Sequence, residues 1–183
     1  MSKKTRINLP TILTLLRIIL VVPLLVCIFM DSVPARIVAV ACFVLASITD
    51  FVDGRLARGR NEVTDLGKFL DPLADKMLVN LTFLALVVLG QVPVWVFGII
   101  LVRDFAVDGV RMMAASKRVV IDASKYGKAK TMVQMITISL IILNLIVGSE
   151  ALNVINMILL GLVVCLTVGS GLDYIVRGWK HVI

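Results

Sequence analysis

Apolar residues dominate this chain in six long runs, which are separated by short polar breaks. The runs cover residues 10–30, 35–58, 69–89, 92–116, 126–147 and 151–174. Each is close to the roughly 20 residues that an α-helix needs to cross a bilayer. Because the breaks are short, neighbouring helices are expected to be antiparallel hairpins. The pattern predicts an all-α integral membrane protein, a six-transmembrane-helix bundle that forms one domain over residues 1–183.

The composition strengthens this prediction. Of the 183 residues, 60% are hydrophobic, and the mean hydropathy is +1.03. An ordinary soluble domain is nearer half apolar on the broadest count, so soluble and disordered classes are excluded. Cys27, Cys42 and Cys165 each lie in an apolar run without metal-ligand spacing. They are interpreted as packing residues rather than a disulfide framework or a zinc site.

The positive charges are distributed unevenly between the two sides of the predicted bundle. The net charge is +7, and 18 of the 19 Lys and Arg residues lie at or toward one side, with Arg36 near the other. Cytoplasmic loops collect such residues, which favours an N-in, C-in protein of the cell (inner or plasma) membrane over a nucleic-acid binder. The basic N-terminus is expected to be a short interfacial segment. Trp95, Tyr174 and Trp179 are interpreted as interfacial aromatics.

Charged residues enter four of the runs at a similar depth on the cytoplasmic side. The uncharged stretches are 13 residues long at 18–30, 37–49 and 77–89, and 11 residues long at 92–102. Thirteen helical residues span roughly 20 Å, whereas the hydrocarbon core is about 30 Å thick. Charges facing lipid at that depth are costly. We therefore expect them to line a shared polar chamber that opens to the cytoplasm.

Four aspartates form the centre of this chamber. Asp50 and Asp53 are three residues apart and Asp71 and Asp75 are four apart, so each pair shares a helix face. The intervening hairpin is expected to bring the two faces together. Converging carboxylates in a low-dielectric site must bind protons or cations. Oxygen ligands without His or Cys indicate Mg²⁺ or Mn²⁺, and two ions could be held, as in two-metal phosphoryl-transfer sites.

The residues around these aspartates point to phosphate chemistry. Gly54, Ala57 and Gly67 leave space beside the backbone for a flat or bulky group, and Arg58 offers a phosphate fork. This arrangement is typical of a site for a nucleotide-like phosphate. Two simpler interpretations stay open at this point. Asp50 and Asp53 could be a charge cluster at a helix end, and Asp71 followed by a proline could mark a helix start.

From Asp50 to Asp75 the sequence reads D-x2-D-G-x2-A-R-x8-G-x3-D-x3-D. This resembles the complete signature of the CDP-alcohol phosphotransferase family. Residues 8–17, 103–111 and 127–131 are similar to segments of the bacterial phosphatidylglycerophosphate synthases in that family, and the resemblance covers about residues 7–135. The sequence differs at Asp104, where those synthases commonly have Glu, and at Asp108, where Thr or Ser is usual.

The resemblance implies an activity and assigns roles to the residues of the signature. It implies transfer of the phosphatidyl group from CDP-diacylglycerol to sn-glycerol 3-phosphate with release of CMP, within membrane lipids and in a homodimer. Asp75 would act as general base and also as a metal ligand together with the other three aspartates. The implied CDP-lipid site consists of Asp50, Gly54, Ala57, Arg58 and Gly67.

An acceptor that carries its own phosphate needs a separate cationic site. Arg103 and Arg111 are eight residues apart and share a helix face, and Lys128 begins the next helix from the same side. We predict that these three residues bind the acceptor phosphate and regard Lys130 as a weaker candidate. Asp104 and Asp108 are expected to pair with the two arginines.

Three other functions remain as alternatives. The same chemistry could use another acceptor, such as inositol phosphate or serine. Carboxylates inside a membrane also serve ion-coupled transporters, although the uncharged outer halves of all six helices argue against a path across the bilayer. A scaffold without activity is disfavoured by the intact signature.

Overall fold

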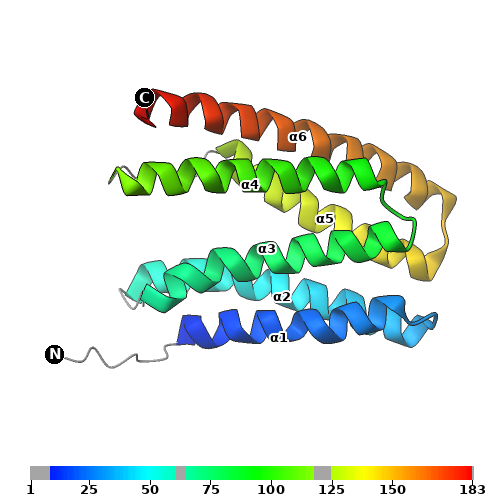
Figure 1. Ribbon diagram of the computed structural model, residues 1–183. Helices are drawn as coiled ribbons and strands as arrows, with labels where there is room; N and C mark the ends of the chain where they lie inside the picture. Colours follow the sequence, from blue (N-terminus) through cyan, green and yellow to red (C-terminus); the bar gives the residue numbers. More distant parts are fainter. Residues whose placement is uncertain (1–8, 61–64, 118–124, 183) are drawn as a thin grey trace. The chain divides into compact units, whose positions relative to one another are not determined.

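The computed structural model describes the backbone of residues 9–60, 65–117 and 125–182, and the side chains at 12, 14–49, 70, 72–117 and 126–176. The described chain is helical and contains no strand (Figure 1). Its helices are α1 (Leu9–Phe29), α2 (Val33–Arg60), α3 (Asp65–Val88), α4 (Val94–Ser116), α5 (Lys125–Val147) and α6 (Glu150–Val182). They match the six predicted runs closely, so the all-helical prediction is confirmed. The predicted N-terminal interfacial segment and the side chain of Trp179 lie outside the described residues.

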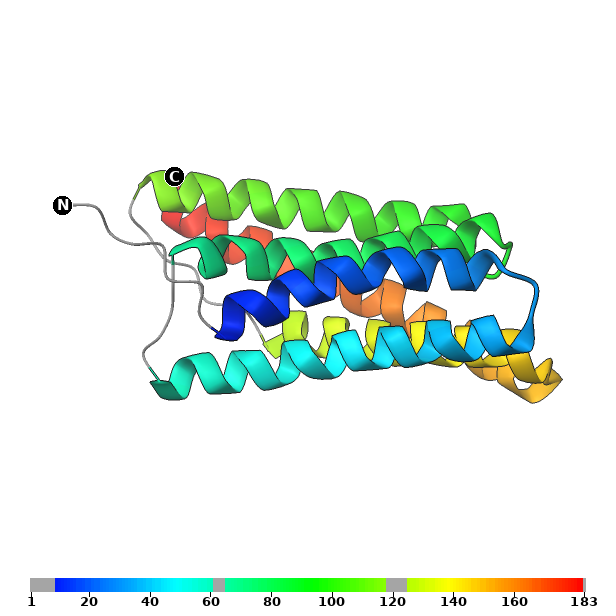
Figure 2. The same cartoon turned by 90° about the horizontal axis from the view of Figure 1, so that it is seen from below.

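The helices group into two compact units. One unit comprises residues 1–85 and 142–147, and the other comprises residues 86–141 and 148–183. In the first unit, α1 and α2 pack against each other as an antiparallel hairpin (Figure 2). In the second, α4 and α6 lie side by side and run in the same direction (Figure 1). The single membrane domain expected from the sequence stays a prediction.

A glycine ends α3 in the manner that helix stop signals predict. Gly90 has φ +72°, a left-handed conformation that suits a residue without a Cβ atom. Its amide donates to the carbonyl of Val87 at 2.9 Å, and the amide of Gln91 donates to Leu86 at 2.9 Å. This pair of bonds is a Schellman motif, which satisfies carbonyls that the helix end leaves open.

Pro72 lies inside α3, because this helix begins at Asp65. The interpretation of Asp71 and Pro72 as a helix start is therefore wrong. A proline inside a helix removes one backbone hydrogen bond. Ala74 and Leu78, two and six residues further on, are fully buried. Tertiary packing of this kind supplies most helical stability in proteins, and it accounts for the continuous helix here.

Arg36 joins α2 to the end of α5 within the first unit. Its Nη1 donates to the carbonyl oxygen of Leu145 at 2.7 Å, and its Nη2 lies 2.7 Å from Oδ1 of Asp31. Leu145 belongs to the last turn of α5, where carbonyls lack helical partners and a positive charge is favourable. This contact at the end of α5 explains why Arg36 lies apart from the other basic residues, near the predicted outer side.

The helices expose apolar side chains and bury polar ones. Large hydrophobic residues of several helices are exposed, among them Ile19, Val22, Val102, Met157 and Ile158. Fully or almost fully buried polar residues include Thr14, Arg17, Thr82, Gln134, Thr137, Thr167 and Ser170. This distribution suits lipid surroundings, where an apolar surface has no cost and polar groups need partners inside the protein.

Two of the described helices are long and apolar enough to cross a membrane. These stretches are Tyr126–Val147 in α5 and Glu150–Val176 in α6. Their uncharged stretches, residues 131–147 and 152–172, are longer than those of the other four helices. Shorter apolar stretches cover Thr14–Phe29 and Val33–Thr49.

Candidate active site

The helices that carry the aspartate signature have the regularity that the spacing argument requires. The backbone of α2 is helical to Arg60 and that of α3 is helical from Asp65, as the three- and four-residue spacings assume. Asp75 is half-buried, and its Oδ1 atom is covered. The side chains of the other predicted metal ligands and of the CDP-lipid site lie outside the described residues: Asp50, Asp53, Gly54, Ala57, Arg58, Gly67 and Asp71. Their convergence stays a prediction.

The donor set of the signature fits a hard divalent cation. All four groups are carboxylates, and neither His nor Cys occurs between Asp50 and Asp75. Oxygen-only donors suit Mg²⁺ or Mn²⁺ rather than zinc or copper.

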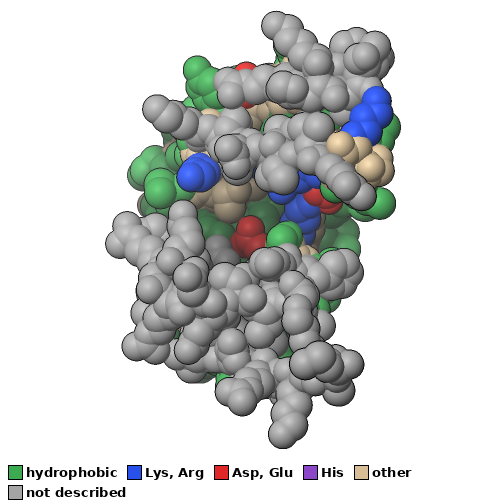
Figure 3. All heavy atoms as spheres, turned by 90° about the vertical axis from the view of Figure 1, so that its left-hand side faces the viewer, with side chains coloured by type: hydrophobic (Ala, Val, Ile, Leu, Met, Phe, Trp, Pro, Cys, Tyr) green, Lys and Arg blue, Asp and Glu red, His purple; other side chains and the backbone are tan. Residues whose placement is uncertain are grey.

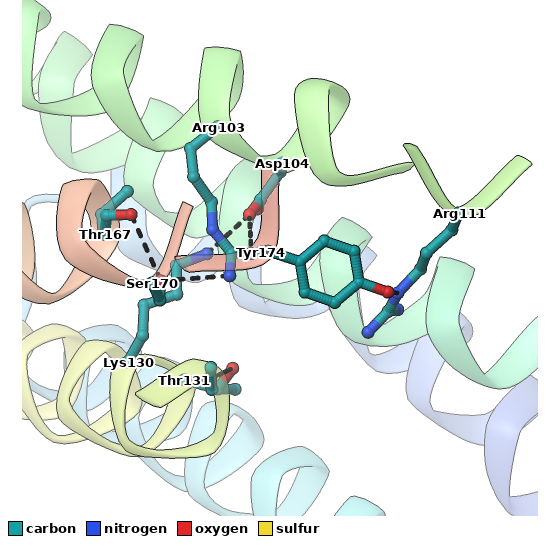
Figure 4. A network of polar contacts seen from close by, with 9 residues as sticks. Arg103, Asp104, Arg111, Lys130, Thr131, Thr167, Ser170 and Tyr174 are labelled. Atoms are coloured by element: carbon teal, nitrogen blue, oxygen red, sulfur yellow. Dashed lines mark hydrogen bonds and ion pairs between the residues drawn. The ribbon is translucent and has the colours of Figure 1, made fainter. Parts of the chain in front are cut away.

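The second unit contains a cluster of charged and polar residues from three helices, which we call the arginine cluster. It consists of Arg103, Asp104 and Arg111 of α4, Lys130 of α5, and Ser170 and Tyr174 of α6 (Figure 4). Figure 3 faces the ends at which α4 and α6 terminate and shows basic and acidic side chains there.

Asp104 holds two cations inside this cluster. Its Oδ1 lies 2.6 Å from Nζ of Lys130 and 3.1 Å from Nη1 of Arg103 (Figure 4). The side chains of Asp104, Lys130 and Arg103 are 11%, 5% and 15% exposed. Buried charges are tolerated only when they are paired in this way. The expected pairing of Asp104 with Arg103 is confirmed.

Arg111 is held by an aromatic residue of α6. Its Nε donates to the hydroxyl of Tyr174 at 3.0 Å, and its guanidinium carbon lies over the ring, 5.3 Å from the centroid. Tyr174 is only 2% exposed, so its interpretation as an interfacial aromatic is wrong. Its ring is buried in the protein and lies under the guanidinium group of Arg111. Arg103 and Arg111 both contact α6, which confirms that they share a face of α4.

Two small residues of α6 make room for Arg103. Nη2 of Arg103 donates to the hydroxyl of Ser170 at 3.1 Å, and Ser170 in turn donates to the carbonyl of Thr167 at 3.2 Å. A Cβ atom at Gly171 would lie 2.9 Å from Cγ of Arg103. Sequence reasoning missed Ser170, Gly171 and Tyr174. The consecutive small residues 169–171 within an apolar run were the available signal.

Of the two lysines at the start of α5, Lys130 joins the cluster and Lys128 is exposed. Residues two apart on a helix point to nearly opposite sides, so the rotation of α5 decides which one is buried. The proposed role of Lys128 in binding the acceptor stays a prediction.

A comparison with known protein families identifies the family to which the chain belongs. Residues 7–169 match the family model for CDP-alcohol phosphatidyltransferase, and the chain belongs to this family. Its members are membrane-associated enzymes that generally use divalent metal ions. Ser170, Gly171 and Tyr174 lie just beyond the matched residues.

Individual relatives are similar along most of their length. The chain is 40% identical over 178 residues to a probable phosphatidylglycerophosphate synthase of Mycobacterium tuberculosis, covering 96% of this chain and 83% of the relative. It is 37% identical over 186 residues to the CDP-diacylglycerol–glycerol-3-phosphate 3-phosphatidyltransferase of Bacillus subtilis, covering 94% and 96%. A Rickettsia bellii protein with the same name is 38% identical over 172 residues, covering 91% and 93%.

Proposed function

We propose that this protein transfers the phosphatidyl group of CDP-diacylglycerol to sn-glycerol 3-phosphate, producing phosphatidylglycerophosphate and CMP for phospholipid biosynthesis. The intact aspartate signature supports the donor, and the names of the similar proteins support the acceptor. One structural observation carries the choice of a phosphorylated acceptor. The guanidinium of Arg111 is oriented by the hydroxyl of Tyr174 rather than by a carboxylate, a contact that leaves its positive charge available to an anion.

The acceptor phosphate would bind to Arg103, Arg111 and Lys128. A guanidinium pairs with phosphate through two parallel hydrogen bonds, which fixes orientation as well as affinity. Among the described residues, the terminal nitrogens of Arg111 form no hydrogen bond that competes with such a pair. An acceptor without phosphate, such as serine, would make these cations unnecessary.

The donor would bind along α2 and α3. Asp50, Asp53, Asp71 and Asp75 would hold Mg²⁺ or Mn²⁺, with two ions in the proposed arrangement. Such ions, when bound, would neutralise the diphosphate and the departing CMP. The CDP group would lie against Gly54, Ala57 and Gly67, which leave the backbone accessible, with Arg58 on a phosphate and Asp50 contributing to both sites.

Asp75 would accept the proton of the acceptor hydroxyl. The hydroxyl oxygen forms a bond to the phosphorus that carries diacylglycerol, and the bond from that phosphorus to the bridging oxygen breaks, so CMP leaves with the electron pair. A base must lie within hydrogen-bond reach of the proton it removes. The half-buried position of Asp75 is compatible with this role.

The proposed membrane arrangement follows from the distribution of charge. All six helices would cross the cell membrane, with both termini and the active site on the cytoplasmic side and the protein present as a homodimer. A lipid donor keeps its acyl chains in the bilayer, so its diphosphate lies near the interface. The charged residues of α4 begin at Arg103, near the middle of the helix, and continue toward the end that would face the cytoplasm.

An acceptor panel tests this proposal. Purified protein is supplied with CDP-diacylglycerol, Mg²⁺ or Mn²⁺, and glycerol 3-phosphate, inositol phosphate or serine, and CMP release is measured with and without a chelator. We expect metal-dependent release with glycerol 3-phosphate. Release with another acceptor alone would overturn the assigned acceptor, whereas ion flux into liposomes without any CMP release would favour a transporter.

A further inference from the structure

The C-terminal half of α6 contacts both arginines of the proposed acceptor site, at residues just beyond the match to the family model. Ser170 accepts a hydrogen bond from Arg103, and Tyr174 accepts one from Arg111. Gly171 leaves the space that the side chain of Arg103 occupies. We propose that Ser170, Gly171 and Tyr174 are positioning residues that aim Arg103 and Arg111 at the phosphate of the acceptor. This inference rests on the proposed function.

Tyr174 restricts Arg111 in two ways. The hydrogen bond at 3.0 Å engages Nε, and the ring lies under the guanidinium group at 5.3 Å from its carbon. Arg111 is otherwise an exposed residue, so a long side chain with several rotatable bonds would sample many conformations. With Nε engaged by a residue that is 2% exposed, the two terminal nitrogens form a fork of fixed orientation. Preorganisation of this kind improves affinity by lowering the entropy lost on binding.

Gly171 and Ser170 restrict Arg103 by shape and by hydrogen bonding. A Cβ atom at position 171 would approach Cγ of Arg103 to 2.9 Å, and Cγ belongs to the base of the side chain rather than its flexible end. Any larger residue would therefore displace the whole guanidinium group. Its Nη2 is tied to Ser170 at 3.1 Å and its Nη1 to Asp104 at 3.1 Å. Each terminal nitrogen carries a second hydrogen that can still be donated to a phosphate.

Matched variants separate positioning from folding. Tyr174→Phe keeps the ring and removes the hydroxyl, and Tyr126→Phe makes the same change at an exposed tyrosine of α5. Gly171→Ala has its control in Gly169→Ala on the same helix, where an added Cβ atom meets nothing within 4 Å.

Ser170→Ala removes the acceptor for Arg103, and Ser170→Thr restores a hydroxyl. Thermal unfolding in detergent identifies any variant that fails to fold.

The measured quantities are kcat and the KM values for glycerol 3-phosphate and for CDP-diacylglycerol, together with the inhibition constant of inorganic phosphate. Tyr174→Phe and Gly171→Ala should each raise the KM for glycerol 3-phosphate about three- to tenfold, because one hydrogen bond is worth about that factor. The inhibition constant of phosphate should rise in parallel, and the KM for the lipid should stay constant. Ser170→Thr should recover most of what Ser170→Ala loses.

Two results would overturn the inference while leaving the proposed function intact. One is an unchanged KM for glycerol 3-phosphate in folded Tyr174→Phe and Gly171→Ala. The other is an equal rise in the KM values for both substrates, which would indicate a general structural role. Failure of the unsubstituted enzyme to use glycerol 3-phosphate would instead refute the proposed function itself.

Discussion

The ammonium group of Lys130 and the carboxylate of Asp104 lie 2.6 Å apart, and both side chains are almost completely buried. The same carboxylate oxygen also contacts Arg103. A single acidic group therefore holds together two cations from two helices, α4 and α5. The carboxylate of Asp104 thus stabilises both Arg103 and Lys130 inside the protein.

Replacing Asp104 by Ala should destabilise the protein by about 3–5 kcal/mol, because two buried cations would lose their counter-charge. Unfolding in detergent would measure the loss. The double variant Asp104→Ala with Lys130→Met should recover part of it, since one uncompensated charge is then absent. Asp31→Ala is the control, because Asp31 is 93% exposed and exposed pairs contribute little. Equal stability of Asp104→Ala and the control would contradict the prediction.

Asp53→Asn and Asp71→Asn should each abolish CMP release. An amide is a neutral and weaker ligand than a carboxylate for hard divalent ions. The assay is CMP release from CDP-diacylglycerol at saturating glycerol 3-phosphate, with Asp31→Asn as a control for loss of one negative charge. Normal turnover in either variant would refute its assignment as a metal ligand.

Arg111→Ala and Arg103→Ala should raise the KM for glycerol 3-phosphate about 10- to 100-fold, the range expected when one hydrogen bond to a charged group is lost. The KM for CDP-diacylglycerol should change far less. Lys117→Ala, at the exposed end of α4, tests whether any nearby positive charge has the same influence. If both KM values shift equally, these arginines do not form the acceptor site.

Arg36→Ala should reduce stability by about 1–2 kcal/mol, because the carbonyl of Leu145 loses a charged donor at the end of α5. Catalytic constants should be unchanged, since this contact is at the opposite end of α2 from the aspartate signature. Thermal unfolding and CMP release measured on the same preparation would check both statements. A drop in activity at unchanged stability would show that Arg36 has a different role.

The sequence was sufficient to predict the helices, because long apolar runs ended by signals such as Gly90 leave little freedom in helix boundaries. It also predicted that Arg103 and Arg111 share a face, which follows from helical periodicity alone. Tyr174 was misinterpreted, since a tyrosine near the end of an apolar run has the same local sequence whether it faces lipid or a neighbouring helix. The choice between Lys128 and Lys130 depended on the rotation of α5, which tertiary packing decides.

The glycine at position 171 has a practical consequence for how this enzyme is handled. A gene shortened at residue 169, where the match to the family model stops, would keep every signature aspartate and every basic residue assigned to the acceptor. It would nevertheless lose Ser170, Gly171 and Tyr174, which contact Arg103 and Arg111. An expression boundary taken from the family model alone, which ends earlier than the alignments with individual relatives, would thus keep the predicted catalytic residues and, by the inference above, weaken binding of the acceptor.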